Sequence, residues 1–200
     1  RLARDEQDLG RAAQFYDVAL AADPEHQPLL HQTMVLMLAE GRMAEAIGLA
    51  KRRVAKRSDA AMARLILTAD AIRGNDLAAA RHHLLQTKRK NYMSLLQPML
   101  LAWIDAGDDQ YEDAIKVLGQ LRDRKVFAPF RTYHSALISD FAGHEKAAQK
   151  AYEATLKGNV PRATRVAMNY GGFLSRNDRR DEALALFEDI LRRNPSNPVI

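Results

Sequence analysis

Apolar residues recur along this chain at helical spacing, in segments separated by short polar turns. In DEALALFEDILRRNP (181–195), Ala183, Phe187 and Ile190 with Leu191 form one apolar stripe, and Pro195 ends the segment. Alanine, leucine, arginine, lysine, glutamate and glutamine dominate the periodic segments, and these residues favour helix. Glycine and proline fall between the segments. The pattern therefore predicts an all-α protein.

The spacing of the stripes and turns predicts about eleven helices, a single helix followed by five pairs. The expected bounds are 9–22 for the single helix, then 27–39 with 43–56, 60–73 with 76–88, 93–106 with 110–123, 128–141 with 144–157, and 163–176 with 180–193.

An alanine recurs every 34 residues, at Ala12, Ala46, Ala80, Ala114 and Ala148, and Ala183 follows after 35. A fixed period of this length is typical of stacked helical repeats. A small residue lets a neighbouring helix approach closely, and a large residue four positions later fills the space beyond it in most copies. Because no single pair can bury both its faces, we expect one array over 1–200. Its parts are a second helix at 9–22 and repeats at about 27–58, 60–92, 93–126, 128–160 and 162–195.

The second helices share a more specific pattern. It is found in GRAAQFYDVALAADP (10–24), GRMAEAIGLA (41–50), YEDAIKVLGQL (111–121), GHEKAAQKAYEATL (143–156) and DEALALFEDILRRNP (181–195). In this pattern the chain resembles the tetratricopeptide repeat family, in a divergent form similar to bacterial multi-repeat proteins. The first helices lack the family's usual aromatic residue, and its usual glycine is present only as Gly171. The resemblance implies a right-handed α-solenoid of stacked antiparallel helix pairs.

In that family the first helices line an inner, concave surface that binds partners. The resemblance therefore implies a groove at His31, Val35, Leu65, Ala69, Met99, Trp103, Phe130, Tyr133, His134, Leu137 and Met168. Independently, the large apolar residues from Phe130 to Phe141 are spaced three, four and four, so they share one helix face. We interpret this face as an apolar groove for a partner segment. The alternative is a displaced register, in which Trp103 and this face belong to the core.

Charge and composition narrow the function classes. The chain has 30 Lys and Arg against 25 Asp and Glu, a net charge of +5. Its basic clusters at 51–57, 88–90 and 122–125 fall near the ends of second helices, where cations oppose the helix dipole, so we do not expect nucleic-acid binding. The absence of cysteine excludes disulfides and thiolate metal sites. No acid, base and nucleophile arrangement or metal-ligand spacing stands out, so we expect no catalysis, cofactor or metal.

The function that we expect is a non-catalytic protein–protein interaction scaffold. The alternatives are a carrier or sensor of an apolar small molecule or lipid in the same groove, and a homo-oligomeric assembly module. No apolar run reaches the roughly 20 residues of a membrane helix. The chain begins with Arg1 rather than Met, so we expect it to be a trimmed or processed product. Its similarity to exported multi-repeat proteins of proteobacteria implies the cell envelope or periplasm, with the cytoplasm as the alternative.

Overall fold

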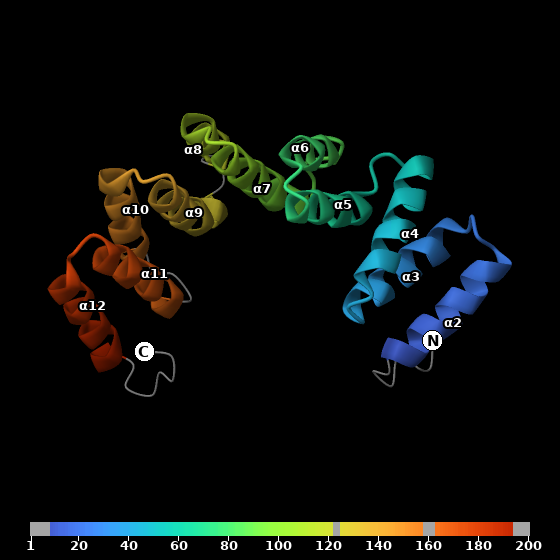
Figure 1. Cartoon of the computed structure of the whole chain (residues 1–200), viewed down its shortest axis with the longest axis horizontal. Helices are drawn as coiled ribbons and strands as arrows, with labels where there is room; N and C mark the ends of the chain where they lie inside the picture. Colours follow the sequence, from blue (N-terminus) through green and yellow to red (C-terminus); the bar gives the residue numbers. More distant parts are fainter. Residues whose placement is uncertain (1–8, 122–124, 158–162, 194–200) are drawn as a thin grey trace. The chain divides into compact units, whose positions relative to one another are not determined.

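The computed structural model describes residues 9–121, 125–157 and 163–193. Within these residues the chain forms eleven α-helices, one short 3-10 helix and no strand (Figure 1). The α-helices are α2 (Leu9–Ala22), α3 (Gln27–Ala39), α4 (Met43–Lys56), α5 (Ala61–Arg73), α6 (Leu77–Leu85), α7 (Met93–Gly107), α8 (Tyr111–Gly119), α9 (Ala128–Phe141), α10 (Glu145–Lys157), α11 (Ala163–Arg176) and α12 (Arg180–Arg193), and η1 (Lys125–Phe127) is the 3-10 helix. The predicted all-α class and its eleven helices are confirmed.

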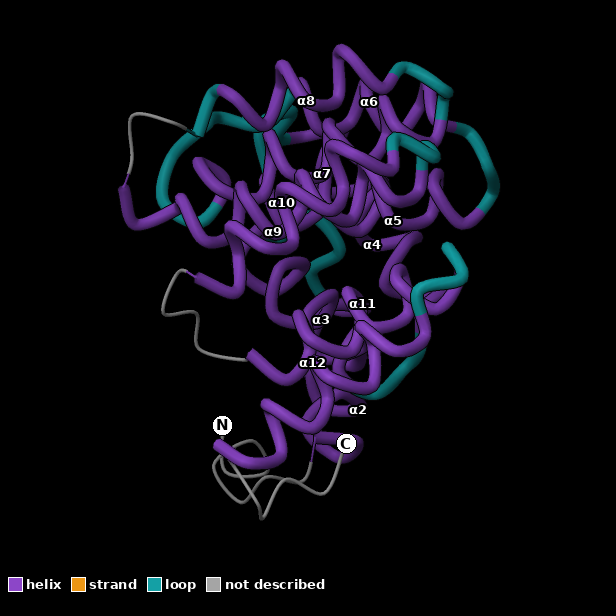
Figure 2. The backbone as a smooth tube through the Cα atoms, turned by 90° about the vertical axis from the view of Figure 1, so that its left-hand side faces the viewer, coloured by secondary structure: helices purple, strands orange, loops and turns teal. Residues whose placement is uncertain are grey.

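Helices that follow one another along the chain pack as pairs. Helix α3 packs on α4, α5 on α6, α9 on α10 and α11 on α12. Short loops connect them (Figure 2). Most of the helices begin and end within a residue of the predicted bounds. The exceptions are α6 and α8, which end earlier than expected.

Helix α6 ends at Leu85 instead of 88. Two side chains hydrogen-bond to the Leu84 carbonyl, which in a longer helix would accept from the amide of residue 88. The Thr87 hydroxyl donates to the Leu84 carbonyl at 2.7 Å, and the Gln97 amide donates to the same oxygen at 2.9 Å. Helix α8 ends at Gly119 instead of 123. There the helix ends in a tighter turn, in which the Leu121 amide donates to the carbonyl three residues earlier, that of Leu118, at 3.0 Å. Residues 122–124 lie outside the described part.

The turns inside the pairs repeat one backbone conformation. A residue with positive φ stands in each of them: Gly41 (73°), Asn75 (58°), Asp109 (57°), Gly143 (72°) and Asp178 (59°). Glycine, asparagine and aspartate tolerate this left-handed region better than other residues. The next amide then reaches back five residues, for example from Arg42 to the Met37 carbonyl at 2.8 Å, which satisfies the end of the first helix. The turn thus follows the same period as the alanines.

The core follows the alanine period. All six alanines of the series are at most 3% exposed. The chain divides between Gln97 and Pro98, within α7, into two compact units. One apolar cluster is built by α2 to α5 in the first unit, and another by α9 to α12 in the second. The single array over 1–200 stays a prediction.

Candidate functional site

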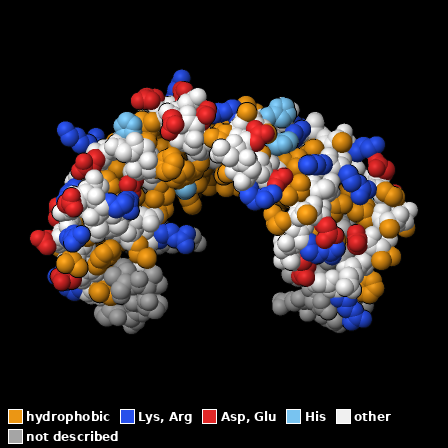
Figure 3. Space-filling view, in the orientation of Figure 1, with side chains coloured by type: hydrophobic (Ala, Val, Ile, Leu, Met, Phe, Trp, Pro, Cys, Tyr) orange, Lys and Arg blue, Asp and Glu red, His pale blue; other side chains and the backbone are white. Residues whose placement is uncertain are grey.

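The face of α9 predicted from residue spacing lies at the boundary between core and solvent. Phe130 and Phe141 are 47% and 63% exposed. Tyr133 and Leu137, between them, are half-buried and pack against the core of the second unit. The face is therefore anchored in the core at its centre and open at both ends. Hydrophobic side chains gather over α7 and α9 in the space-filling view (Figure 3).

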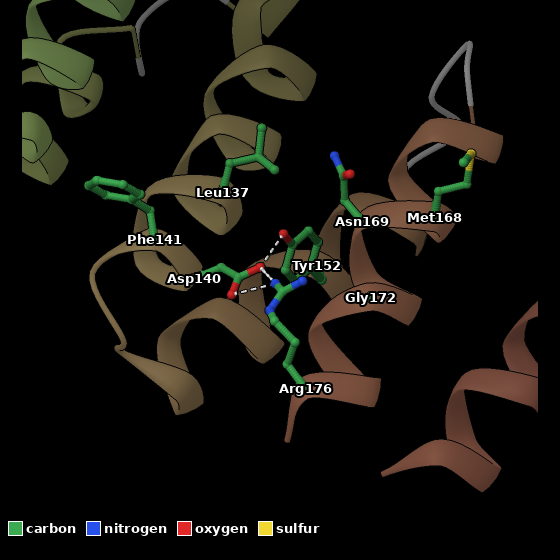
Figure 4. Close-up of a pocket in the computed structure, with 8 residues that line it drawn as sticks. All are labelled: Leu137, Asp140, Phe141, Tyr152, Met168, Asn169, Gly172 and Arg176. Atoms are coloured by element: carbon green, nitrogen blue, oxygen red, sulfur yellow. Dashed lines mark hydrogen bonds and ion pairs between the residues drawn. The ribbon is translucent and has the colours of Figure 1, made fainter. Parts of the chain in front are cut away.

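A pocket of about 480 Å³ opens beside this face, where α9, α10 and α11 meet. The apolar part of its wall is formed by Leu137 and Phe141 on α9 and the exposed Met168 on α11 (Figure 4). Gly172 on α11 also lines it, and the absence of a side chain there leaves the space open. Binding sites commonly combine apolar side chains with polar groups in a concave pocket, and this pocket has both.

An ion pair forms the polar part of the pocket. Arg176 Nη2 donates to both carboxylate oxygens of Asp140, at 2.8 and 3.0 Å, and Tyr152 Oη donates to Oδ2 at 3.0 Å (Figure 4). Burial raises the pKa of Tyr152, and the Asp140 charge raises it further, so this phenol stays protonated and remains a donor. The three side chains come from α9, α10 and α11 and therefore tie the walls of the pocket together.

A second polar contact joins α9 to α11. Asn169 Nδ2 donates to Tyr133 Oη. Burial raises the pKa of Tyr133 above its ordinary value, so the phenol is neutral at physiological pH. This bond fixes the Tyr133 ring, which sits half-buried at the edge of the core.

Trp103 and His134 connect α7 to α9. Trp103 Nε1 donates to His134 Nδ1 at 2.9 Å, and the Trp103 ring meets the Phe141 ring edge-on with centroids 6.2 Å apart. Because Nδ1 accepts this bond, the geometry assigns the neutral imidazole with its proton on Nε2. Burial lowers the pKa of His134, which favours the same form. Trp103 is half-buried, which is intermediate between the exposure expected of a groove residue and the full burial expected of a core residue.

The remaining predicted residues are divided between the two units. On α7, Met99 is half-buried. In the first unit His31 and Leu65 are half-buried, and Val35 and Ala69 are exposed. Of the predicted groove residues, Leu137 and Met168 line the pocket described above.

His31 lines a separate pocket of about 300 Å³, together with Arg53 and Arg57. Burial lowers the pKa of His31, and the Arg53 charge lowers it further. His31 Nδ1 is buried and has no hydrogen-bond partner among the described residues. His31 therefore stays neutral at physiological pH.

The basic cluster at 51–57 has a structural use on α4. Arg53 Nη1 donates to the Gln27 carbonyl at 2.6 Å, Arg52 Nη2 donates to the Pro24 carbonyl, and Lys56 pairs with Glu25 at 2.9 Å. These contacts hold the turn between α2 and α3. These three cations of the cluster therefore have a structural role.

The sequence did not indicate Asp140 and Arg176 as site residues. They are 36 residues apart, so no local motif connects them. The signal that was available is their position: Asp140 follows the predicted groove residue Leu137 by three residues, and Arg176 follows Met168 by eight, so each lies on the same helix face as a predicted groove residue. A charged residue on a helix face that is otherwise apolar is therefore a sequence signal for a site residue.

The described residues contain neither a membrane-spanning helix nor a metal-binding cluster. No helix there has both the length and the apolar character to cross a lipid bilayer. In the same residues, no group of three or more histidine, aspartate and glutamate side chains is arranged to hold a metal ion.

No protein-family model matches the chain, and no curated protein matches it by sequence. Solved structures do match it. A tetratricopeptide repeat protein from Parabacteroides merdae aligns with a TM-score of 0.81 at 11% identity, covering 95% of this chain and 75% of that one. PilW, described as a widely conserved type IV pilus biogenesis factor, aligns with a TM-score of 0.74 at 13% identity, covering 98% and 90%. YrrB, described as a tetratricopeptide repeat protein with an unusual peptide-binding site, aligns with a TM-score of 0.59 at 14% identity, covering 94% and 96%.

These likenesses define the class of the protein. The chain has the fold of the tetratricopeptide repeat proteins, built from paired helices with a buried small residue in each second helix. The resemblance predicted from the second-helix pattern is confirmed at the level of the fold.

Proposed function

We propose that the protein is a non-catalytic scaffold that binds a segment of a partner protein at the pocket between α9, α10 and α11. The observation that carries the proposal is the pocket of about 480 Å³ with the exposed side chains of Phe141 and Met168 at its rim. Large apolar side chains that remain in contact with water beside a cavity are typical of protein-binding surfaces. The peptide-binding site described for YrrB, which shares the fold, supports a peptide as the ligand.

Binding energy would come from apolar burial. A large side chain moved from water into such a pocket contributes about 1.5–3 kcal/mol. The Asp140–Arg176 pair and the Tyr152 hydrogen bond hold the walls before the partner arrives. A preformed site loses less conformational entropy on binding than a flexible one.

The test is capture of a partner by variants that change only the rim. Phe141→Ala with Met168→Ala removes both exposed side chains, and we expect it to change the free energy of unfolding by less than about 1 kcal/mol. The matched control is Phe15→Ala with Leu184→Ala, which removes two large apolar side chains that are 61% and 60% exposed and outside the pocket. We expect immobilised wild type and control to retain the same partner and the rim variant to lose it. Equal retention by all three would refute the proposal.

The alternative of an apolar small molecule uses the same pocket. Native mass spectrometry of freshly purified protein separates the two, because a retained lipid adds a defined mass. The Asp140–Arg176 ion pair in the pocket disfavours an acyl chain, which offers it no hydrogen-bonding group.

A further inference from the structure

Two of the three helices that form the pocket, α9 and α11, carry an unbalanced charge. The charged residues of α9 and α11 are Arg131, Asp140, Arg165 and Arg176, three cations and one carboxylate. The second helices differ, since α10 and α12 each carry both signs in similar number. Because Asp140 is already paired with Arg176, it leaves no carboxylate on α9 or α11 to balance the other two cations.

Arg165 lies on the same side of α11 as two residues that line the pocket. It precedes Met168 and Gly172 by three and seven residues, which places all three on one side of the helix. Burial raises the pKa of Tyr133 on α9, and the Arg165 charge opposes that effect. Arg165 is exposed and makes no hydrogen bond or ion pair with another described residue. Its charge is therefore available to a ligand.

Arg176 keeps unused donors inside the pocket. Both of its bonds to Asp140 come from Nη2, although a guanidinium has five N–H donors. Its Nη1 lies over Gly172, 3.3 Å from where a Cβ would stand. The side chain is 63% exposed. A ligand oxygen entering the space above Gly172 can therefore accept a hydrogen bond from Arg176.

These observations deepen the proposed function, on which they depend. We propose that the partner segment is acidic as well as apolar: a large apolar side chain fills the pocket between Phe141 and Met168, and an aspartate or glutamate within about one turn of it pairs with Arg165 and with the free donors of Arg176. The apolar side chain supplies most of the affinity. The carboxylate fixes the orientation of the segment and discriminates against neutral and basic segments.

The experiment is selection of a random peptide library on the wild-type protein, with depletion on the Phe141→Ala and Met168→Ala variant. We expect the enriched peptides to place an acidic residue within four positions of a large apolar residue. The affinity of a resynthesised peptide should fall about tenfold on Arg165→Glu and less than about threefold on Arg180→Glu, a control with the same charge change on α12. Replacing the peptide's acid with its amide should remove the difference between wild type and Arg165→Glu.

The outcomes separate the two proposals. Pocket-dependent peptides without acidic enrichment, or with basic enrichment, would overturn the acidic partner and leave the scaffold function intact. A library from which no peptide distinguishes wild type from the rim variant would overturn the scaffold function itself. Binding to vesicles of phosphatidylglycerol and phosphatidylcholine that depends on Arg165, in the absence of peptide binding, would replace the acidic peptide with a membrane surface.

Discussion

At the scale of single residues, Gly171 and Phe187 show how closely paired helices approach in the second unit. A Cβ placed on Gly171 would stand 2.2 Å from Phe187 Cζ, well inside van der Waals contact. Phe187 occupies the position four residues after the alanine of its repeat, where the sequence predicted a space-filling side chain. The missing side chain of the glycine in the first helix thus leaves the space that the large residue of the second helix fills.

This contact predicts the effect of a single methyl group. Gly171→Ala should lower the free energy of unfolding by about 1–3 kcal/mol, because the Phe187 ring must leave its position. Gly172→Ala is the control, since its Cβ would meet only the end of the flexible Arg176 side chain, at 3.3 Å. Alanine's better helix propensity should leave that variant at least as stable as wild type. Urea denaturation measures both, and equal stabilities for the two variants would contradict the packing argument.

The second residue-scale prediction concerns pH. Burial lowers the pKa of His134 in the folded protein, so between that value and the ordinary pKa of about 6.5 the unfolded chain binds more protons. The stability that neutral His134 contributes should therefore be complete above pH 6.5 and decline as the pH falls below it. Protonation also ends the hydrogen bond from Trp103, the only tryptophan of the chain.

Tryptophan fluorescence of the folded protein measures this titration directly. We expect a transition with its midpoint below pH 6.5 that is absent from His134→Gln. A midpoint above pH 6.5 would mean that a carboxylate, and not burial, dominates the surroundings of His134.

At the scale of helices and turns, local signals set most of the architecture. Helix α3 was predictable because Pro28 stands in its first turn and Gly41 follows its end, and both residues act through their own backbone. Helix α6 was predicted three residues too long. The amide that shortens it comes from Gln97, thirteen residues beyond Leu84, and no local pattern reports that contact.

Glycine-to-alanine substitution should change the stability in opposite directions at two positions, one in a turn and one inside a helix. Gly143 has a φ of 72° and Gly48 lies inside α4, and an added Cβ would meet nothing within 4 Å at either position. Only the backbone conformation differs. Gly143→Ala should therefore destabilise the protein by about 1–2 kcal/mol, and Gly48→Ala should stabilise it by up to about 1 kcal/mol. Thermal unfolding would show a lower Tm for the first and a higher one for the second; two shifts of the same sign would contradict this account.

The candidate site was only partly predictable at this scale. The spacing from Phe130 to Phe141 identified the open face of α9, because that face depends on helical geometry alone. The Asp140–Arg176 pair was missed, because it depends on how α9 and α11 are placed against each other across α10. The Trp103–His134 bond likewise joins two first helices and follows from their packing.

At the scale of the whole molecule, the repeated contacts account for the fold of each unit. Each buried alanine and each left-handed turn residue recurs with the period of the repeat, so the same pair is built again from divergent sequence. In the second unit, the surface of these repeats carries the pocket and its cations. The proposed binding site therefore lies on α9 and α11, with α10 as their support.

Hydrogen–deuterium exchange tests that assignment most directly, using the protein with and without a peptide selected on it. The account predicts slower exchange over 130–141 and 165–176 when the peptide is bound, and no such change in the Phe141→Ala and Met168→Ala variant. Protection confined to α12 or to the first unit, with α9 and α11 unchanged, would contradict it.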